Sequence, residues 1–391
     1  MSKIEVKGIY KLFGKQPQKW LAAAQSGMSK EELLAKSGHT LGLRDISLNI
    51  EAGSIHVIMG LSGSGKSTLI RHFNRLIEPT AGQILVDGQD VTALAPRELE
   101  KFRQQKMSMV FQRFGLFPHR SVLDNAAYGL KVQGVKRSER EEKALYWLEQ
   151  VGLKGFEKQF PHQLSGGMQQ RVGLARALAT DAEILLMDEA FSALDPLIRR
   201  EMQDQLLVLQ EKLHKTIVFI THDLDEALRI GNRIAILKDG ELVQEGSPED
   251  ILLRPANDYV AAFLQDVNRS KVLTAAHAIH GGIPRLSVDS SAADAVQAMS
   301  QAKQDYSAVL DGTQLKGVLT LNAAQQASAN GTAINAQLID VAQIAGHTPL
   351  DNLLGDLLTD RQPAAVVDEN GHYRGMLARS KVAQLLGAQV A

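Results

Sequence analysis

The chain has no cysteine, almost no net charge and no long apolar run, and each absence removes a class of function. Without cysteine among 391 residues, disulfides, thiol catalysis and cysteine-based metal sites are excluded. Lys plus Arg number 43 and Asp plus Glu 44, so the basic surface that favours general nucleic-acid binding is not expected. No apolar run approaches the roughly 18 residues of a membrane-spanning helix, and the first residues lack the apolar core of a signal peptide. We expect a soluble, cytoplasmic protein that acts at a membrane, if at all, by docking to partners.

What is present indicates an α/β domain in the first two thirds of the chain. Residues 3–14 read as a strand, and residues 43–59 return to strands before a glycine-rich loop and a helix. ILLMD at 184–188 and TIVFI at 216–220 are short apolar runs of the kind found in buried strands. Strands separated by helices imply a mainly parallel sheet that is covered on both faces.

Helix and turn signals account for the segments between these strands. Residues 15–40 look helical and separate, with Ser29 and Glu32 spaced as in a capping box. Residues 95–175 are expected to be mostly helical. RIAILKDGELVQEG at 233–246 predicts a hairpin, because Asp-Gly suits the backbone angles of a tight turn.

Near residue 270 the composition shifts toward Ala, Gln and Leu, and the sequence then repeats itself. SAADAV at 291–296 matches TPLDNL at 348–353, and AVLD at 308–311 matches AVVD at 365–368, both at a spacing of 57 residues. Each half reads helix, strand, turn, strand, helix. Two such halves predict a module whose sheets pack face to face.

A phosphate-binding loop is the strongest motif that mechanism alone can interpret. GLSGSGKST at 60–68 fits G-x-x-x-x-G-K-[ST] and lies between a strand and a helix, as that mechanism requires. Its glycines let backbone N–H groups face phosphate oxygens, and the helix adds its positive N-terminal end. Lys66 is expected to reach the β- and γ-phosphates, and Ser67 to ligate Mg²⁺. The predicted phosphate site is Gly60, Ser62, Gly63, Ser64, Gly65, Lys66, Ser67 and Thr68.

Two adjacent acids stand at the end of the strand at 184–188. The carboxylate of Asp188, beside the phosphate loop, suits a Mg²⁺ partner that acts through water. Glu189 would then polarise the attacking water; the alternative is a pair of exposed surface acids. His222 follows the strand at 216–220, where a lone histidine is more often a packing or capping residue, and Gln112 carries even less signal alone.

LSGGMQQR at 164–171 changes this reading, because it resembles the signature motif of the ATP-binding subunits of ABC transporters. A serine and glycines at a helix start make a second anion site. In that family the P-loop of one subunit faces the signature loop of another, so two ATP molecules are sandwiched in a head-to-tail dimer. SALD at 192–195 is similar to the family's D-loop, which crosses that interface. The resemblance thus adds Ser165, Gly166, Gly167 and Asp195 to the nucleotide-binding residues.

The same resemblance gives roles to three residues that are ambiguous in isolation. Gln112, in VFQRFGLFP, matches the Q-loop glutamine, which touches Mg²⁺ and the attacking water and senses the transmembrane partner. His222 matches the switch histidine at the γ-phosphate. Phe13 is the best match to the aromatic residue that stacks on adenine. The implied catalytic residues are Glu189, His222 and Gln112, and the implied metal ligands are Ser67, Gln112 and Asp188.

The resemblance narrows to the glycine betaine/proline betaine (quaternary amine) uptake family. Ordinary import ATPases lack the insert KQPQKWLAAAQSGMSKEELLAKSGHT, and the repeat resembles tandem CBS domains. The implied fold is α/β: a P-loop NTPase ABC ATPase domain with a RecA-like core, an antiparallel β subdomain and a helical subdomain, followed by an α+β tandem CBS module. The expected bounds are 1–270 for the ATPase domain, 15–40 for its insert, about 113–175 for its helical subdomain and 271–391 for the CBS module.

The repeat departs from the pattern of CBS halves that bind adenosine ligands. Those usually carry Thr followed shortly by Asp after the second strand. Here the first half has Thr320 but Asn322, the second half reads MLARSKV with neither residue, and the chain ends without the acidic tail of some relatives. The module is expected to be regulatory with an open ligand, or only to hold the dimer together.

The resemblance therefore implies an ATP hydrolase that uses ATP and Mg²⁺ to energise import of betaine-type osmolytes. Its partners would be a second copy of the chain, transmembrane permease subunits and, indirectly, a periplasmic or tethered substrate-binding protein, but no nucleic acid. It would lie peripherally on the cytoplasmic face of the inner membrane. The alternatives are another solute, such as choline, carnitine or an amino acid, and a soluble ABC-type ATPase that acts on DNA or ribosomes. A nucleotide kinase is excluded, because it has no use for LSGGMQQR.

Overall fold

The computed structural model describes residues 2–112, 114–265, 267–359 and 363–387. The chain forms two compact units, Met1–Gln265 and Asp266–Ala391. Ser270 donates a hydrogen bond to Asp351, at 2.6 Å, so the segment before residue 271 already belongs to the second unit. The boundary lies five residues before the predicted one, which was residue 270. Over the described ranges, no helix combines the length and the apolarity that crossing a membrane demands.

The first unit contains an antiparallel sheet in the order β2-β1-β4-β5. In β1, apolar side chains such as Ile4 and Val6 alternate with polar ones, so that one face of the strand is buried. This sheet is the antiparallel β subdomain. Its strands are β1 (Ser2–Phe13), β2 (Thr40–Glu51), β4 (Ala81–Val86) and β5 (Gln89–Asp90).

The second sheet of the first unit has the order β10-β9-β3-β8-β7-β6 and is parallel except for β10. Its central strands are buried along their whole length, which explains why they are continuous apolar runs. β6 lies inside the region 95–175 that was expected to be mostly helical. The strands are β3 (Ile55–Met59), β6 (Met107–Val110), β7 (Ile184–Asp188), β8 (Thr216–Thr221), β9 (Arg233–Lys238) and β10 (Glu241–Gly246).

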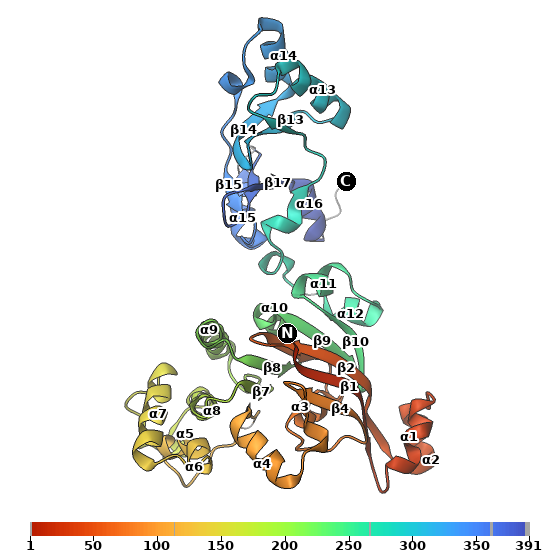
Figure 1. Cartoon of the computed structure of the whole chain (residues 1–391), viewed down its shortest axis with the longest axis vertical. Helices are drawn as coiled ribbons and strands as arrows, with labels where there is room; N and C mark the ends of the chain where they lie inside the picture. The colour runs from red at the N-terminus through yellow and green to blue at the C-terminus, as the bar shows by residue number, and fades with distance from the viewer. Residues whose placement is uncertain (1, 113, 266, 360–362, 388–391) are drawn as a thin grey trace. The chain divides into compact units, whose positions relative to one another are not determined.

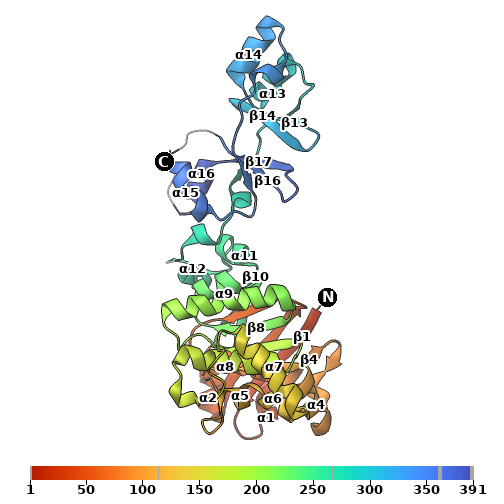
Figure 2. The same ribbon diagram turned by 90° about the vertical axis from the view of Figure 1, so that its left-hand side faces the viewer.

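Helices cover this sheet and extend from it. α3 packs against β2, β7 and β8, and a single core of buried apolar side chains joins both sheets to α3. α5, α6, α7 and α8 pack on one another as the helical subdomain, which Figures 1 and 2 show together beside the sheet. The helices are α3 (Lys66–Phe73), α4 (Pro96–Gln105), α5 (Val122–Ala126), α6 (Tyr128–Val132), α7 (Arg137–Gln150), α8 (Gly166–Ala179), α9 (Pro196–Leu213), α10 (Leu224–Ile230), α11 (Pro248–Leu253) and α12 (Asp258–Phe263).

The insert between β1 and β2 forms two short helices, α1 (Gln18–Gln25) and α2 (Lys30–Ser37). The predicted capping box is present: Ser29 accepts from the backbone of Glu32, and Glu32 accepts from that of Ser29. Leu12, Ala24, Leu33 and Leu41 form a small buried cluster that ties both helices to the ends of β1 and β2. The insert is thus an ordered part of the unit, and α1 and α2 lie together in Figure 1.

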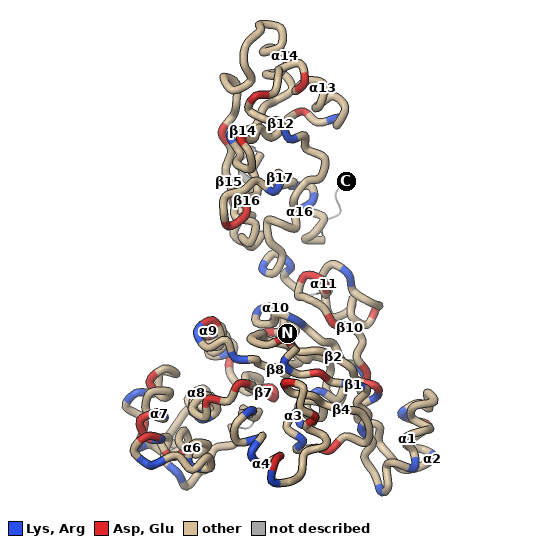
Figure 3. The backbone as a smooth tube through the Cα atoms, viewed as in Figure 1, with Lys and Arg blue, Asp and Glu red and all other residues tan. Residues whose placement is uncertain are grey.

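The second unit has the predicted internal repeat. Each half is a short strand followed by helix, strand, turn, strand and helix, and apolar residues of both halves, among them Val318 and Met376, share one buried cluster. Charged residues are sparse over much of this unit (Figure 3). Its elements are β11 (Ile279–His280), β12 (Arg285–Ser287), α13 (Ala292–Ala302), β13 (Tyr306–Asp311), β14 (Gln314–Thr320), α14 (Leu321–Asn330), β15 (Gln343–Ala345), α15 (Leu350–Thr359), β16 (Ala365–Val367), β17 (Tyr373–Leu377) and α16 (Arg379–Leu385).

Candidate nucleotide site

The glycine-rich loop joins β3 to α3 at the centre of the parallel sheet. At Gly60, φ is +152° and an added Cβ would lie 2.2 Å from the carbonyl oxygen of Leu237; at Gly65, φ is +100° and a Cβ would lie 2.8 Å from that of Gly42. A Cβ at Gly63 would meet nothing within 4 Å. Gly60 and Gly65 therefore allow the loop to pack against the backbone of Leu237 and Gly42, whereas the space next to Gly63 is open. Such a loop can approach phosphate oxygens with its backbone N–H groups.

Lys66, in the first turn of α3, points into this loop. The buried ammonium of Lys66 donates to the carbonyl oxygens of Gly60 and Leu61, at 2.9 and 3.0 Å. Burial lowers the pKa of Lys66, and the carboxylates of Glu189 and Asp188 partly offset this. The lysine thus places a positive charge against the backbone of the loop.

The end of β7 lies against the start of α3. Asp188 is buried, accepts a 2.7 Å hydrogen bond from the hydroxyl of Ser67, and accepts a 3.2 Å charge-assisted bond from Arg71. Arg71 was not among the residues predicted from the sequence, although its place one turn beyond Ser67 could have indicated it. The structure brings the predicted metal ligands Ser67 and Asp188 into direct contact.

The carboxylate of Glu189 lies close to the other two predicted catalytic residues, Gln112 and His222. Its carboxylate accepts a 2.9 Å hydrogen bond from Gln112 and lies 3.6 Å from Nδ1 of His222 and 4.0 Å from Nζ of Lys66. Its φ is +46°, an uncommon conformation for a residue with a side chain. Three segments that are far apart in sequence thus converge on one carboxylate. Strain of this kind is often retained where a side chain must be aimed.

The signature segment begins a helix, as predicted. Ser165 is the N-cap of α8 and accepts a 3.3 Å bond from the N–H of Met168. An added Cβ at Gly167 would lie 2.8 Å from the side chain of Ile198, so the start of α8 abuts the start of α9. Asp195 caps α9 through the N–H groups of Leu197 and Ile198. Across the described ranges, no hydrogen bond or ion pair connects Ser165 with the P-loop, so the two predicted anion sites are not joined in this way within one chain.

Phe13 lies at the end of β1, over Gly42. A Cβ on Gly42 would lie 2.6 Å from the ring, and the carbonyl of Gly42 in turn packs against Gly65 at the end of the P-loop. Phe13 is 40% exposed, and the ammonium of Lys11 lies 5.1 Å from the centre of its ring. An exposed aromatic face is therefore held beside the phosphate loop.

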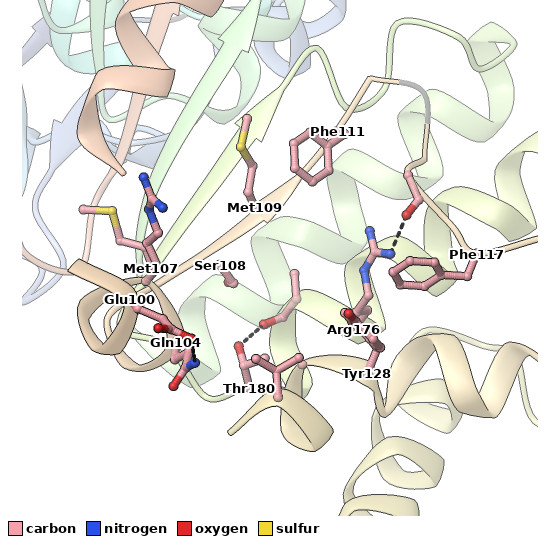
Figure 4. Close-up of a pocket in the computed structure, with 15 residues that line it drawn as sticks. Glu100, Gln104, Met107, Ser108, Met109, Phe111, Phe117, Tyr128, Arg176 and Thr180 are labelled. Atoms are coloured by element: carbon pink, nitrogen blue, oxygen red, sulfur yellow. Dashed lines mark hydrogen bonds between the residues drawn. The ribbon is translucent and has the colours of Figure 1, made fainter. Parts of the chain in front are cut away.

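A cavity of about 470 Å³ opens between β6 and the helical subdomain. Its walls include Met109, Phe111 and Arg176, as Figure 4 shows, and Phe111 directly precedes Gln112. Arg176 donates to the carbonyl oxygens of Gly115 and Phe114, at 2.6 and 3.1 Å, and burial lowers its pKa. This cavity was not predicted from the sequence, because its lining comes from segments on both sides of the Q-loop.

This arrangement defines an ABC-type ATPase. At one edge of a parallel sheet it combines a P-loop with two adjacent acids, a glutamine and a histidine, and the signature segment begins a separate helix. The ABC transporter family model matches residues 43–192. The glycine betaine/proline betaine transport ATP-binding protein of Salmonella typhimurium is 48% identical over 389 residues, which is 98% of this chain and 97% of that protein. The glycine betaine/carnitine transport ATP-binding protein of Listeria monocytogenes is 48% identical over 100% of this chain and 99% of its own.

A solved structure agrees with this class. It is a dimeric ATP-binding cassette in a post-hydrolysis state with ADP and phosphate, 34% identical, which covers 63% of this chain and 98% of its own with a TM-score of 0.54. The chain therefore belongs to the ABC transporter family, as an ATP-binding subunit whose ATP hydrolysis is coupled to transport.

Proposed function

We propose that the chain hydrolyses ATP to energise import of glycine betaine/proline betaine-type osmolytes through membrane permease subunits. The observation that carries the solute class is similarity at 48% identity over nearly the whole length of two glycine betaine transport proteins. Those matches include the insert and the repeated second unit, and not only the ATPase core. The solute itself would contact the permease and its receptor, because no residue of this site is built for it.

For the nucleotide, the base stacks on Phe13 and the phosphates occupy the P-loop. The exposed face of Phe13 and the open space above Gly63 support this orientation, since Phe13 packs on Gly42, whose carbonyl oxygen lies against Gly65 at the end of the same loop. Lys66 turns from the carbonyls of the loop to the β- and γ-phosphates. The remaining contacts come from Ser62, Ser64, Ser67 and Thr68.

The residues beside the P-loop fit a magnesium ion. Mg²⁺ keeps several waters and takes few protein ligands. This agrees with a site made from the hydroxyl of Ser67, the carboxylate of Asp188 and the amide of Gln112, the first two of which are already in contact at 2.7 Å. When bound, the ion would neutralise charge on the phosphates.

Glu189 is placed to orient and polarise the attacking water. Its carboxylate is held by the amide of Gln112, and His222 lies near the same oxygen, Oε2, from where we propose that it reaches a γ-phosphate above the P-loop. Gln112 therefore senses both the metal and the general base, and Lys66 stabilises the charge on the transferring group.

A second copy of the chain completes each ATP site. The facing parts would be the P-loop of one copy and the segment Ser165–Gly167, with Asp195, of the other. Support comes from the dimeric ATP-binding cassette that the first unit resembles. Two apolar side chains beside these parts are unusually exposed, Leu61 at 55% and Leu197 at 76%. Burying them in the closed dimer would add to its stability.

The cavity beside Gln112 is the proposed docking site for a cytoplasmic segment of the permease. Its lining combines apolar side chains such as Met109 and Val132 with charged ones such as Arg103, and it includes Phe111, one residue before Gln112. A segment seated there could move Gln112 and hence the carboxylate that it holds. The subunit would then lie on the cytoplasmic face of the membrane, and a periplasmic or tethered binding protein would deliver the solute to the permease.

We assign the second unit to a tandem CBS module with a regulatory role. Its two halves have the expected order and share a core. Thr320 caps α14, and Asn322 stands where adenosine-binding halves carry Asp, so an adenine nucleotide is not the proposed ligand. Holding the dimer together is the competing role.

Reconstitution tests the function directly. The chain would be co-purified with its membrane subunits in vesicles, and uptake of labelled glycine betaine, choline, carnitine and an amino acid compared. ATP-dependent uptake of glycine betaine, lost in Glu189→Gln, is expected. Uptake of only one of the other solutes would overturn the proposed solute class. ATPase activity that requires DNA or ribosomes would overturn the proposed role in transport.

A further inference from the structure

One histidine closes the base of the insert, and the site described above does not use it. His39 is 6% exposed. Its Nδ1 lies 3.0 Å from the carbonyl oxygen of Ser37, and its Nε2 lies 2.8 Å from that of Lys15. Ser37 ends α2, and Lys15 precedes α1, so the ring bridges the two ends of the inserted segment.

Both partners of this ring are acceptors. A carbonyl oxygen can only accept a hydrogen bond, and a neutral imidazole has a single N–H, so either tautomer satisfies one carbonyl and leaves a nitrogen lone pair facing the other. The imidazolium has two N–H groups and satisfies both. The geometry therefore matches the protonated ring, and hydrogen bonds from a charged donor are the stronger kind.

The ring also determines the position of the residue that follows Phe13. An added Cβ on Gly14 would lie 2.2 Å from Cδ2 of His39, so the backbone there rests directly on the imidazole. Thr40, the next residue after His39, pairs with Phe13 between β1 and β2. Phe13 therefore lies between two neighbours that depend on His39: Gly14, which packs on the imidazole, and Thr40, which follows His39 in the chain.

We infer that His39 is a positioning residue for the adenine platform of Phe13, and that its imidazolium form favours nucleotide binding. This rests on the proposed role of Phe13. The charged side chains on the segments around the ring include Lys11 on β1, Lys15 itself, Lys19 on α1, and Lys30 and Lys36 on α2, while the acids of α2, Glu31 and Glu32, are in its first turn. No carboxylate in the described ranges is within ion-pair distance of His39, so its charge is matched by the two carbonyls.

The inference predicts a proton-dependent affinity. Histidine changes charge between about pH 5 and 8. With the ring of His39 protonated the clamp has both bonds, and with the ring neutral one carbonyl loses its donor. Leaving one polar group without its partner shifts the equilibrium between the closed and open forms of the His39 clamp by a factor of roughly 5 to 150. Only part of this effect is transmitted to Phe13, so we expect nucleotide binding to weaken about fivefold.

The first test compares affinities in the full-length chain. Kd for Mg-ADP is measured at pH 6 and pH 8 for the native protein, for His39→Gln and for a control at an exposed histidine, His162→Gln. The nucleotide's own ionisation affects all three proteins equally. The ratio of each Kd to that of His39→Gln at the same pH therefore reports only the contribution of His39. Relative to His39→Gln, the native protein and the control should bind Mg-ADP about fivefold more tightly at pH 6 than at pH 8. In ATPase assays the same ratio should appear in the KM for ATP and not in kcat. Equal pH profiles for all three would overturn the inference.

The second test needs no change at His39. Trp20 lies 6.2 Å from the ring, centre to centre, and Trp147 is the chain's other tryptophan. With Trp147→Phe, fluorescence of Trp20 should fall as the imidazolium forms. Because linkage is reciprocal, a fivefold preference requires the midpoint of that transition to rise by about 0.7 pH unit when Mg-ADP is added. An unmoved midpoint contradicts the inference even if His39→Gln fails to fold.

Phe13→Ala separates this inference from the site on which it rests. If Phe13 is the platform, this variant binds Mg-ADP more weakly at both pH values and loses the difference between them. Unchanged affinity in Phe13→Ala overturns the platform and the inference together. Weaker binding that keeps the native pH dependence overturns only the role of His39.

Discussion

Two buried histidines in the first unit should make it sensitive to acid. His56, in β3, is fully buried with neither ring nitrogen hydrogen-bonded in the structure, and burial lowers its pKa to about 4. His72, in α3, bonds only through Nδ1, to the carbonyl of Thr68, and burial lowers its pKa to about 4 as well. An unfolded chain would have histidines near 6.5. As pH falls from 6.5 to 4, the unfolded state takes up protons that the folded state refuses, so the free energy of unfolding falls.

The magnitude follows from that difference. At pH 5 a single group with these two pKa values destabilises the fold by about 2 kcal/mol relative to pH 7.5, and by roughly 3 kcal/mol once the pH reaches 4. His56→Met removes the titrating group and two unpartnered nitrogens while keeping an apolar side chain of similar length. We expect it to be at least as stable as the native chain at pH 7.5 and about 2 kcal/mol more resistant to the change to pH 5.

Urea unfolding followed by tryptophan fluorescence isolates the relevant unit, because Trp20 and Trp147 both lie in it. The native chain, His56→Met and the exposed-site control His162→Met would be compared at pH 7.5 and pH 5. The control should lose as much stability as the native chain. If His56→Met also lost the same amount, the depressed pKa of His56 would be refuted.

Three further outcomes follow from the structure. Gly60→Ala should cost at least about 3 kcal/mol and abolish ATP binding, because its Cβ would lie 2.2 Å from a backbone carbonyl, whereas Gly63→Ala should cost only about 1 kcal/mol in folding, since its Cβ meets open space; equal losses in thermal melts would contradict this. Val132→Glu, in the wall of the cavity, should weaken co-purification with the permease at least tenfold and leave Mg-ADP affinity of the isolated chain unchanged. Leu197→Asp should weaken ATP-dependent dimerisation about tenfold, and undiminished dimerisation measured by sedimentation would remove Leu197 from the interface.

Much of the fold followed from local patterns. The buried strands at 184–188 and 216–220, the capping box of Ser29 and the Asp-Gly hairpin are confirmed, because each depends on residues that are close in sequence. β6 was not predicted, since MSMV is too short and too mixed to stand out between helices. Its strand character comes from pairing with β7, a tertiary contact.

The sequence predicted which residues belong to the site better than it predicted how they are arranged. The motifs named Lys66, Asp188 and Glu189, but the positive φ of Glu189 and the contact of Arg71 with Asp188 depend on how distant strands end. The clamp at His39 is a further case, because its two acceptors are backbone atoms that no side-chain pattern marks. Phe13 remains a prediction, as do the roles of all these residues in catalysis.

The account depends most on an ATP site shared between two copies of the chain. Glu189→Gln keeps the hydrogen-bonding partner of Gln112 and removes the general base, so Mg-ATP should trap a dimer that holds two ATP molecules and does not turn over. Light scattering with bound-nucleotide counting measures this. Adding Ser165→Arg on the same background should return the chain to its ATP-free oligomeric state while each P-loop still binds ATP. An ATP-trapped dimer that persists with Ser165→Arg, or saturating ATP binding with no change in mass in Glu189→Gln, would contradict the shared site.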